Sequence, residues 1–433
     1  MRKATRPSLS IRYDIPVKRA SVLMLNIAHT FFSQLFTINH RENILYKFAL
    51  PNFKSSLKWS LSGVLALALT ACGGDGNGDT VQLTATTATL TSAMSGDQEL
   101  PPTITGALGS GTLSLESPSL RLSGSFTLNG MTATAGHVHL GDTGLNGPVI
   151  VPMTSPTGET FTVPANTVLT LAQAVAFSEG GLYFNAHSAD NPSGEVRGQI
   201  GREVYAAQMS SAQEVPNNAS TATGNGLLNL DTTTRKILGR VTLTGMVATA
   251  AHIHTGVLGA NGPVIFPMTE TVAGSGIWVT AADAVMTDAQ ITSLKAGGLY
   301  FNAHTPAFPG GEVRGQIGLN VKTASLNSAQ EVPLNSSSAT GTGTLVVNPL
   351  TRAVSGSITL TGMTATAAHV HLGATGTNGP VIVPLTSTTP GVFSVPANTA
   401  FTADQFKAYK QGNLYFNAHS SAFPGGEIRG QIR

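Results

Sequence analysis

The sequence predicts a mainly β protein made of three tandem β-sandwich domains, each with one short helix. Downstream of residue 80, the same motifs recur three times in the same order. Within each copy, apolar and polar residues alternate with the period of half-buried strands. Only 11% of the 433 residues are charged and 6% are aromatic, while Thr, Ser, Gly and Ala are abundant. This composition suits a β-rich extracytoplasmic protein better than a helical cytosolic enzyme.

Charge and cysteine content exclude some classes of protein. The formal net charge is +2, and Lys and Arg are spread along the chain apart from the N-terminal segment. Nucleic-acid binding requires a basic surface that such a sequence does not supply, so we expect no nucleic-acid partner. The single cysteine, Cys72, excludes an intrachain disulfide.

The context of Cys72 predicts a signal peptide over residues 54–71. Two lysines precede the apolar run Trp59–Ala71, which has the length of a signal-peptide core and is too short to span a bilayer comfortably. The Leu-Thr-Ala-Cys sequence at 69–72 resembles the bacterial lipobox, which implies cleavage before Cys72 and lipid attachment to its sulfur. Gly73 follows instead of Asp, so the inner-membrane retention signal is absent. We expect a lipid-anchored protein of the bacterial cell envelope, at the periplasmic or surface face of the outer membrane.

The segments on either side of this signal are interpreted separately. Residues 72–86 begin with a Gly- and Asp-rich stretch and are predicted to form a flexible tether. Residues 1–53 precede a signal that normally lies at the start of a chain, and we interpret them as an over-extended gene start or a disordered segment. A second membrane segment at 21–36 is the alternative, although three polar residues interrupt its apolar run.

An internal repeat organises the rest of the chain. Histidine pairs begin at His137, His252 and His369, which are 115 and 117 residues apart. A period this long predicts three complete domains and not solenoid coils, which are too small to fold alone. No flexible linker separates the copies, so we expect them to form a fairly stiff rod. We assign the domains to residues 87–203, 204–320 and 321–433.

Local signals within each copy agree with this fold class. In the first copy, residues 122–128 alternate as in a half-buried strand, and a Gly-Met turn leads into the histidine strand. Thr170 and Gln173 have capping-box spacing, which predicts the start of a short helix, and Gly180 supplies its stop. Two closing segments then form a hairpin. The equivalent helix signals are Thr287, Gln290 and Gly297, then Thr402, Gln405 and Gly412.

Three ordered motifs define a copy. They are a Gln-Glu-Val-Pro opening, a His-x-His-x-Gly-x-x-Gly-x-Asn-Gly-Pro-Val element, and a close formed by Leu-Tyr-Phe-Asn-Ala-His and Gly-Glu-Val/Ile-Arg-Gly-Gln-Ile. Together they resemble the chordin-type domain, CHRD, over residues 89–433. The first copy departs most, with Asp97-Gln98-Glu99-Leu100-Pro101 at its opening and residues 189–193 in its closing loop. The resemblance implies an extracellular domain, found alone or repeated, without a settled biochemical activity. We expect each domain to be an immunoglobulin-like or superoxide-dismutase-like β-sandwich.

Polar residues recur on one face of the predicted strands. Because side chains alternate along a strand, the paired histidines share one face, as do the closing Asn and His and the final Glu and Arg. The candidate metal ligands are His137, His139, His187, His252, His254, His304, His369, His371 and His419. The accompanying polar cluster is Asn185, Glu195, Arg197, Asn302, Glu312, Arg314, Asn417, Glu427 and Arg429.

Two interpretations of this face remain open. Three neutral imidazoles and a carboxylate suit Zn²⁺ or Cu²⁺, which would give one His₃/Glu site per domain. The paired motif also bears a short likeness to that of copper-zinc superoxide dismutase. Alternatively, Glu pairs with Arg, and Asn and His bond the tight loops, in a structural polar cluster. We favour the structural cluster on sequence alone.

Enzymatic functions find little support in the sequence. No Gly-x-Ser-x-Gly element, paired carboxylates or phosphate-cradling loop is visible, and the lone cysteine belongs to the signal. We therefore expect no catalytic residues and no certain cofactor. The leading hypothesis is a lipid-anchored envelope protein whose domains act as a binding or structural module for an unknown extracellular or periplasmic ligand. The alternative is a Zn- or Cu-binding protein or metal-dependent enzyme.

Overall fold

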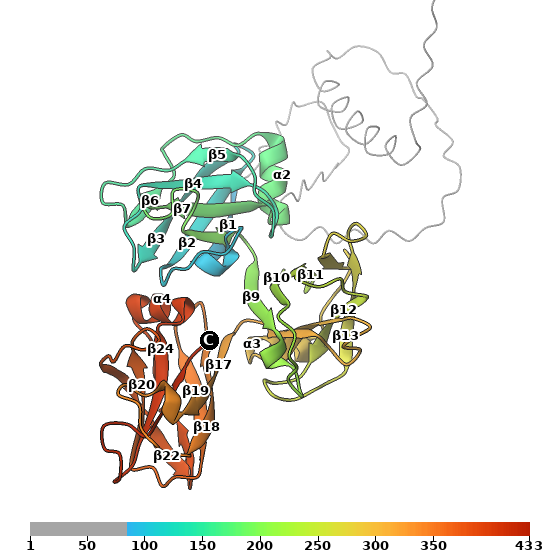
Figure 1. Ribbon diagram of the computed structural model, residues 1–433. Helices are drawn as coiled ribbons and strands as arrows, with labels where there is room; N and C mark the ends of the chain where they lie inside the picture. The colour runs from blue at the N-terminus through green and yellow to red at the C-terminus, as the bar shows by residue number, and fades with distance from the viewer. Residues whose placement is uncertain (1–84) are drawn as a thin grey trace, which may run out of the picture. The chain divides into compact units, whose positions relative to one another are not determined.

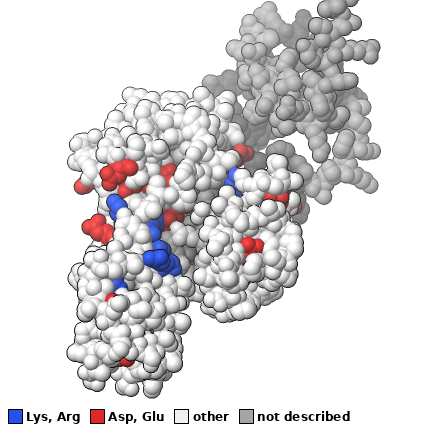
Figure 2. Space-filling view, viewed as in Figure 1, with Lys and Arg blue, Asp and Glu red and all other residues white. Residues whose placement is uncertain are grey.

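The computed structural model of the protein describes residues 85–433 (Figure 1). The predictions for the over-extended start, the signal peptide, Cys72 and nearly all of the tether lie outside these residues. Among the described residues, no helix is long and apolar enough to cross a membrane. On the face shown in Figure 2, most of the surface is formed by uncharged side chains, in line with the low charged fraction.

The first domain is one continuous antiparallel sheet of eight strands with the order β5-β4-β7-β8-β1-β2-β3-β6. One short 3₁₀ helix, η2, and one α-helix, α2, complete the domain. Its strands are β1 Thr86–Ser95, β2 Leu108–Ser117, β3 Arg121–Asn129, β4 Ala135–Leu140, β5 Val149–Pro152, β6 Thr160–Thr162, β7 Leu182–His187 and β8 Val196–Gln199. The helices are η2 Gly96–Gln98 and α2 Leu171–Glu179.

The second domain repeats this strand order and closes it into a barrel. Closure occurs because β13 is seven residues long and pairs directly with β14, whereas the corresponding ends in the first domain meet only through the isolated bridge Thr154–Thr162. The elements are β9 Glu203–Ser210, η3 Ser211–Gln213, β10 Thr223–Leu230, β11 Ile237–Thr244, β12 Ala250–Thr255, β13 Val264–Glu270, β14 Ile277–Thr280, α3 Asp288–Lys295, β15 Leu299–His304 and β16 Val313–Gln316.

The third domain again has the same order, with one additional short strand at its end. The elements are β17 Asn320–Asn327, η4 Ser328–Gln330, β18 Thr340–Val347, β19 Val354–Thr361, β20 Ala367–Leu372, β21 Val381–Pro384, β22 Thr386–Thr389, β23 Val392–Ser394, α4 Ala403–Gln411, β24 Leu414–His419 and β25 Ile428–Gln431. The predicted mainly β fold with one helix per domain is confirmed. The two layers expected of a sandwich are two halves of one curled sheet in each domain.

Each curled sheet encloses its own apolar core. In the first domain, Val138, Phe126 and Phe184 point inward and are almost completely buried, and Phe177 of α2 joins them. Alternation along β4 therefore places Val138 in the core and the flanking histidines on the outer face. The capping boxes predicted for α2, α3 and α4 are all present. The outer face of β4 and β7 is where the candidate site lies.

Candidate metal centre

The register between β4 and β7 brings three histidines together on the outer face of the first domain. His137 pairs with Asn185, while Ala135 pairs with His187, so His187 lies diagonally beside the two histidines of β4. One ring nitrogen from each of His137, His139 and His187 can be chosen so that all lie within 4.8 Å of one another. We call these three residues, and their equivalents in the other two domains, the His triads. The other triads are His252, His254 and His304, and His369, His371 and His419.

Backbone carbonyl groups fix which ring nitrogen of each histidine is protonated. The Nδ1 of His139 lies 2.9 Å from the Gly147 oxygen, and the Nδ1 of His187 lies 3.1 Å from the Pro192 oxygen. A carbonyl oxygen only accepts, so both Nδ1 atoms carry the proton and both Nε2 atoms keep a lone pair. In a metal-binding histidine, the ring nitrogen that does not bind the ion usually donates a hydrogen bond in this way, often to a carbonyl oxygen. The same contacts recur at His254, His304, His371 and His419.

Two of the three nitrogens that remain lie close together in every domain. The Nδ1 of His137 lies 3.0 Å from the Nε2 of His187, and the equivalent distances in the other domains are 3.1 and 3.2 Å. Two nitrogens bound tetrahedrally to one Zn²⁺ at about 2.0–2.1 Å would be about 3.3 Å apart. The Nε2 of His139 is buried without any hydrogen-bond partner, as are those of His254 and His371. The donor set therefore fits a small divalent transition-metal ion.

The surroundings keep these rings neutral. Burial lowers the pKa of His137, His139 and His187 below the ordinary value and is the largest cause at each. The hydrogen bonds to Gly147 and Pro192 act in the opposite direction at His139 and His187. Neutral imidazole is the form that binds metal, so no proton has to be expelled from an imidazolium at pH 7. Burial is also the largest cause of the lowered pKa of His252, His254, His304, His369 and His371.

The closing strand holds the loop that orients His139. Tyr183 stacks on His139 with ring centroids 4.8 Å apart, and the Arg197 guanidinium lies 3.5 Å from the centroid of Tyr183. Arg197 donates to the Asp142 carbonyl oxygen at 2.9 Å, and Gln199 donates to the Gly141 carbonyl oxygen at 2.8 Å. These bonds fix the loop 141–147, whose last carbonyl accepts from His139. Arg197 and its equivalents Arg314 and Arg429 thus act on the loop and not on a ligand.

The carboxylates predicted for the site lie elsewhere. The Glu195 carboxylate accepts from Thr105 at 2.6 Å and from Ser188, so its oxygens are occupied by hydroxyl groups. Glu312 and Glu427 accept from hydroxyl groups in the same way. Within residues 85–433, the groups of ligand atoms close enough for one ion contain histidines alone. The structure therefore replaces the expected His₃/Glu set by a His₃ set.

Asn185 has a partner that the sequence analysis did not select. Its amide donates to the Glu99 carboxylate at 2.9 Å, and Asn302 and Asn417 donate to Glu214 and Glu331. The stacking of Tyr183 on His139 was also missed. The signal for Tyr183 was present, because it is two residues before Asn185 on the same strand face, but strand alternation alone does not reveal a ring stack.

Fold and site together define a class of protein: three tandem β-domains, each with a three-histidine cluster on the outer face of its sheet. The family model of the CHRD domain matches residues 90–200, 205–317 and 322–432. The chain belongs to the CHRD domain family, and the resemblance carried by its motifs is confirmed. No match was found among curated proteins or among solved structures.

Proposed function

We propose that this protein is a lipid-anchored envelope protein that binds a divalent transition metal, Zn²⁺ or Cu²⁺, at the three His triads. The observation that carries the proposal is the buried Nε2 of His139, His254 and His371, which has no hydrogen-bond partner while the opposite nitrogen is held by a carbonyl. A buried acceptor left unpaired costs about 1–3 kcal/mol. A metal ion would use that lone pair in all three domains.

A purely structural role explains the triads less well. The loops beside the histidines are already held by other groups, such as Arg197 and Gln199 on loop 141–147. A histidine needed only for loop bonds would not have its second nitrogen directed toward two further imidazoles. Imidazole donors suit both Zn²⁺ and Cu²⁺. Three protein ligands leave one coordination position for water or an exogenous ligand.

Elemental analysis tests the proposal directly. Residues 80–433, purified without a His-tag and dialysed against Zn²⁺ or Cu²⁺, should retain about three equivalents of metal. His139→Ala should reduce this to about two, and adding His254→Ala and His371→Ala should reduce it to about zero.

Val175→Ala is the control, since it shortens an exposed side chain of α2 and keeps all three nitrogens of the first triad, and it should retain three equivalents. Metal-free protein that is strongly destabilised by the histidine substitutions would instead support the structural cluster favoured on sequence alone.

The lipid anchor is a separate part of the proposal and rests on the context of Cys72 in the sequence. Cys72→Ser should release the protein from the membrane fraction of the expressing bacterium. Gly73→Ala, which keeps the cysteine and still lacks an Asp after it, should leave the protein in that fraction. Unchanged membrane attachment of Cys72→Ser would refute lipidation.

A further inference from the structure

The opening motif of the first domain differs from the other two copies at a position that meets the third domain. Asp97 occupies η2, where the second and third copies have Ala212 and Ala329. Its carboxylate is only 5% exposed. A buried carboxylate is costly unless it is paired and hydrogen-bonded. The substitution therefore requires a specific partner.

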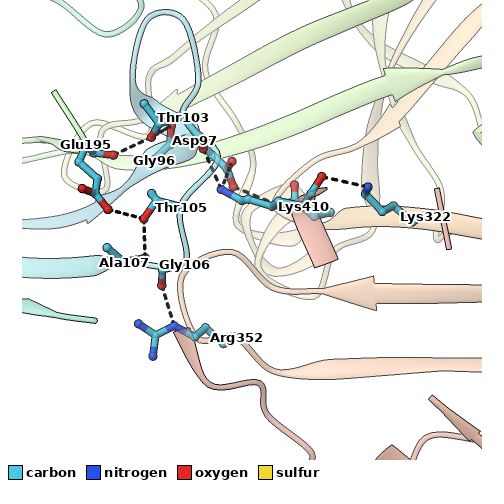
Figure 3. Close-up of polar contacts among 11 residues, drawn as sticks. Gly96, Asp97, Thr103, Thr105, Gly106, Ala107, Glu195, Lys322, Arg352 and Lys410 are labelled. Atoms are coloured by element: carbon cyan, nitrogen blue, oxygen red, sulfur yellow. Dashed lines mark hydrogen bonds and ion pairs between the residues drawn. The ribbon is translucent and has the colours of Figure 1, made fainter. Parts of the chain in front are cut away.

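That partner is Lys410, at the C-terminal end of α4 in the third domain. Its Nζ lies 2.7 Å from Oδ1 of Asp97, and the Lys410 side chain is also 5% exposed (Figure 3). Nζ donates in addition to the Thr103 carbonyl oxygen at 3.4 Å. Asn320, the first residue of β17, donates to Oδ2 of Asp97 at 3.1 Å. Both carboxylate oxygens are thus satisfied, one by Lys410 of α4 and the other by Asn320 at the start of β17.

The third domain is altered in a matching way. In the second domain, the helix position equivalent to Lys410 is Lys295, which pairs at an exposed site with Glu203, the first residue of β9 in the same barrel. Asn320 occupies the position equivalent to Glu203. Glu203 is the first residue of β9 and pairs with the last residue of β10, and Asn320 is the first residue of β17 and pairs with the last residue of β18. An amide cannot neutralise a lysine, but it can donate to a carboxylate. The change from Glu to Asn therefore leaves Lys410 for Asp97 and adds a second donor.

A second contact lies beside this pair. Arg352 of the third domain donates to the Gly106 carbonyl oxygen at 3.0 Å and to the Asn129 side chain at 2.9 Å. A Cβ on Gly106 would lie 1.8 Å from the Ala403 carbonyl oxygen at the start of α4, so a side chain there would prevent the approach. The other copies have Thr221 and Ser338 at this position. Gly106 is therefore a second residue that sets the first domain apart where it meets the third.

We propose that Asp97, Asn320 and Lys410 form a specific intrachain interface that fixes the first and third CHRD domains against each other. We call these three residues the Asp97 lock. The sequence supports it beside the contacts, because an acid occurs at the Asp97 position only in the copy that makes the contact. The interface replaces the stiff rod expected from the short junctions between domains.

Cross-linking tests the lock in the full chain. With Cys72→Ser as background, Asn129→Cys and Arg352→Cys introduce one cysteine into each domain beside the lock, and a short bismaleimide should join them within one chain. Asp97→Ala and Lys410→Ser restore residues that other copies carry, so neither should disturb its own domain. Each should slow intramolecular cross-linking about tenfold, which corresponds to about 1.4 kcal/mol. Combining Asp97→Lys with Lys410→Asp should recover part of the rate.

Lys295→Ser is the matched control, since Lys295 occupies the same helix position but pairs within the second domain, and it should leave the rate unchanged. Equal rates in Asp97→Ala and the parent would overturn the proposal. So would a product that forms between chains and disappears on dilution, because that would assign the contact to two copies of the protein.

Discussion

At the scale of single residues, the buried position of Glu99 beside the closing hairpin changes the pKa of its carboxyl group. Burial raises the pKa of Glu99 to about 7, against the opposing effects of Arg197 and of the Asn185 hydrogen bond. Because the folded pKa lies above the unfolded value of 4.5, the folded state holds the proton more tightly. The contribution of Glu99 to stability is therefore fully present below about pH 4.5 and is lost as the pH rises through about 7.

Glu99→Gln should remove this pH dependence. The parent should lose up to about 3 kcal/mol of unfolding free energy from this group between pH 4.5 and pH 8, and the variant should not. Gln keeps an acceptor for the Asn185 amide, so the hydrogen bond survives. Denaturant unfolding of the parent and the variant at pH 5 and pH 8 measures this loss. Both proteins contain the same histidines, so the histidine contributions cancel when the two pH dependences are subtracted. Parallel pH profiles for parent and variant would contradict the raised pKa.

At the scale of elements, the loop after the histidine strand is set by one glycine. A Cβ on Gly262 would lie 1.7 Å from the Thr255 carbonyl oxygen, and the equivalent distance is 1.6 Å at Gly147 and at Gly379. The carbonyl of the same glycine accepts from His254. The Gly-Pro-Val motif therefore couples a close backbone approach to the orientation of a ring.

Gly262→Ala should force this loop away from the sheet and displace the carbonyl that orients His254. We expect a loss of about 1–3 kcal/mol of stability, as for other overpacked sites. We also expect metal stoichiometry to fall from about three to about two. Gly310→Ala in the same domain is the control, since nothing lies within 4 Å of its Cβ. Full metal retention by Gly262→Ala would show that the carbonyl does not position the ligand.

The elements themselves were largely predictable. The capping boxes at Thr170, Thr287 and Thr402 and the inward position of Val138 follow from local chemistry and strand alternation, and both are observed. Closure of the sheet was not predictable, because it depends on how far β13 extends toward β14, a long-range pairing that no local pattern encodes.

The candidate site was predictable only in part, for a related reason. Alternation placed the histidines, Asn185, Glu195 and Arg197 on common strand faces. Glu195 lies apart from the His triad, because the strand that follows it is separated from β4 across the sheet and its carboxylate accepts hydrogen bonds from hydroxyl groups such as that of Thr105. Which polar groups of one face touch depends on strand order and register, and these were unknown from one sequence.

At the scale of the whole molecule, three triads on three separate domains predict independent metal sites. A ligand present at 100 times its dissociation constant stabilises the state that binds it by about 2.7 kcal/mol. Zn²⁺ should therefore increase amide hydrogen-exchange protection in every domain. His371→Ala should abolish the increase in the third domain only, and EDTA should reverse it in all. Loss of the increase in all three domains from this one substitution would indicate a shared site.

In β4 and β7, one face packs in the apolar core and the opposite face carries the candidate metal ligands. Val138 and Phe184 face the core, while the histidines of the same two strands face outward. The histidines can therefore be exchanged with little change in the apolar core formed by the opposite face. Each domain is in this respect a ready scaffold for protein engineering, in which new ligand sets can be grafted onto a preserved interior. The three copies would allow three different chemistries to be displayed on a single chain.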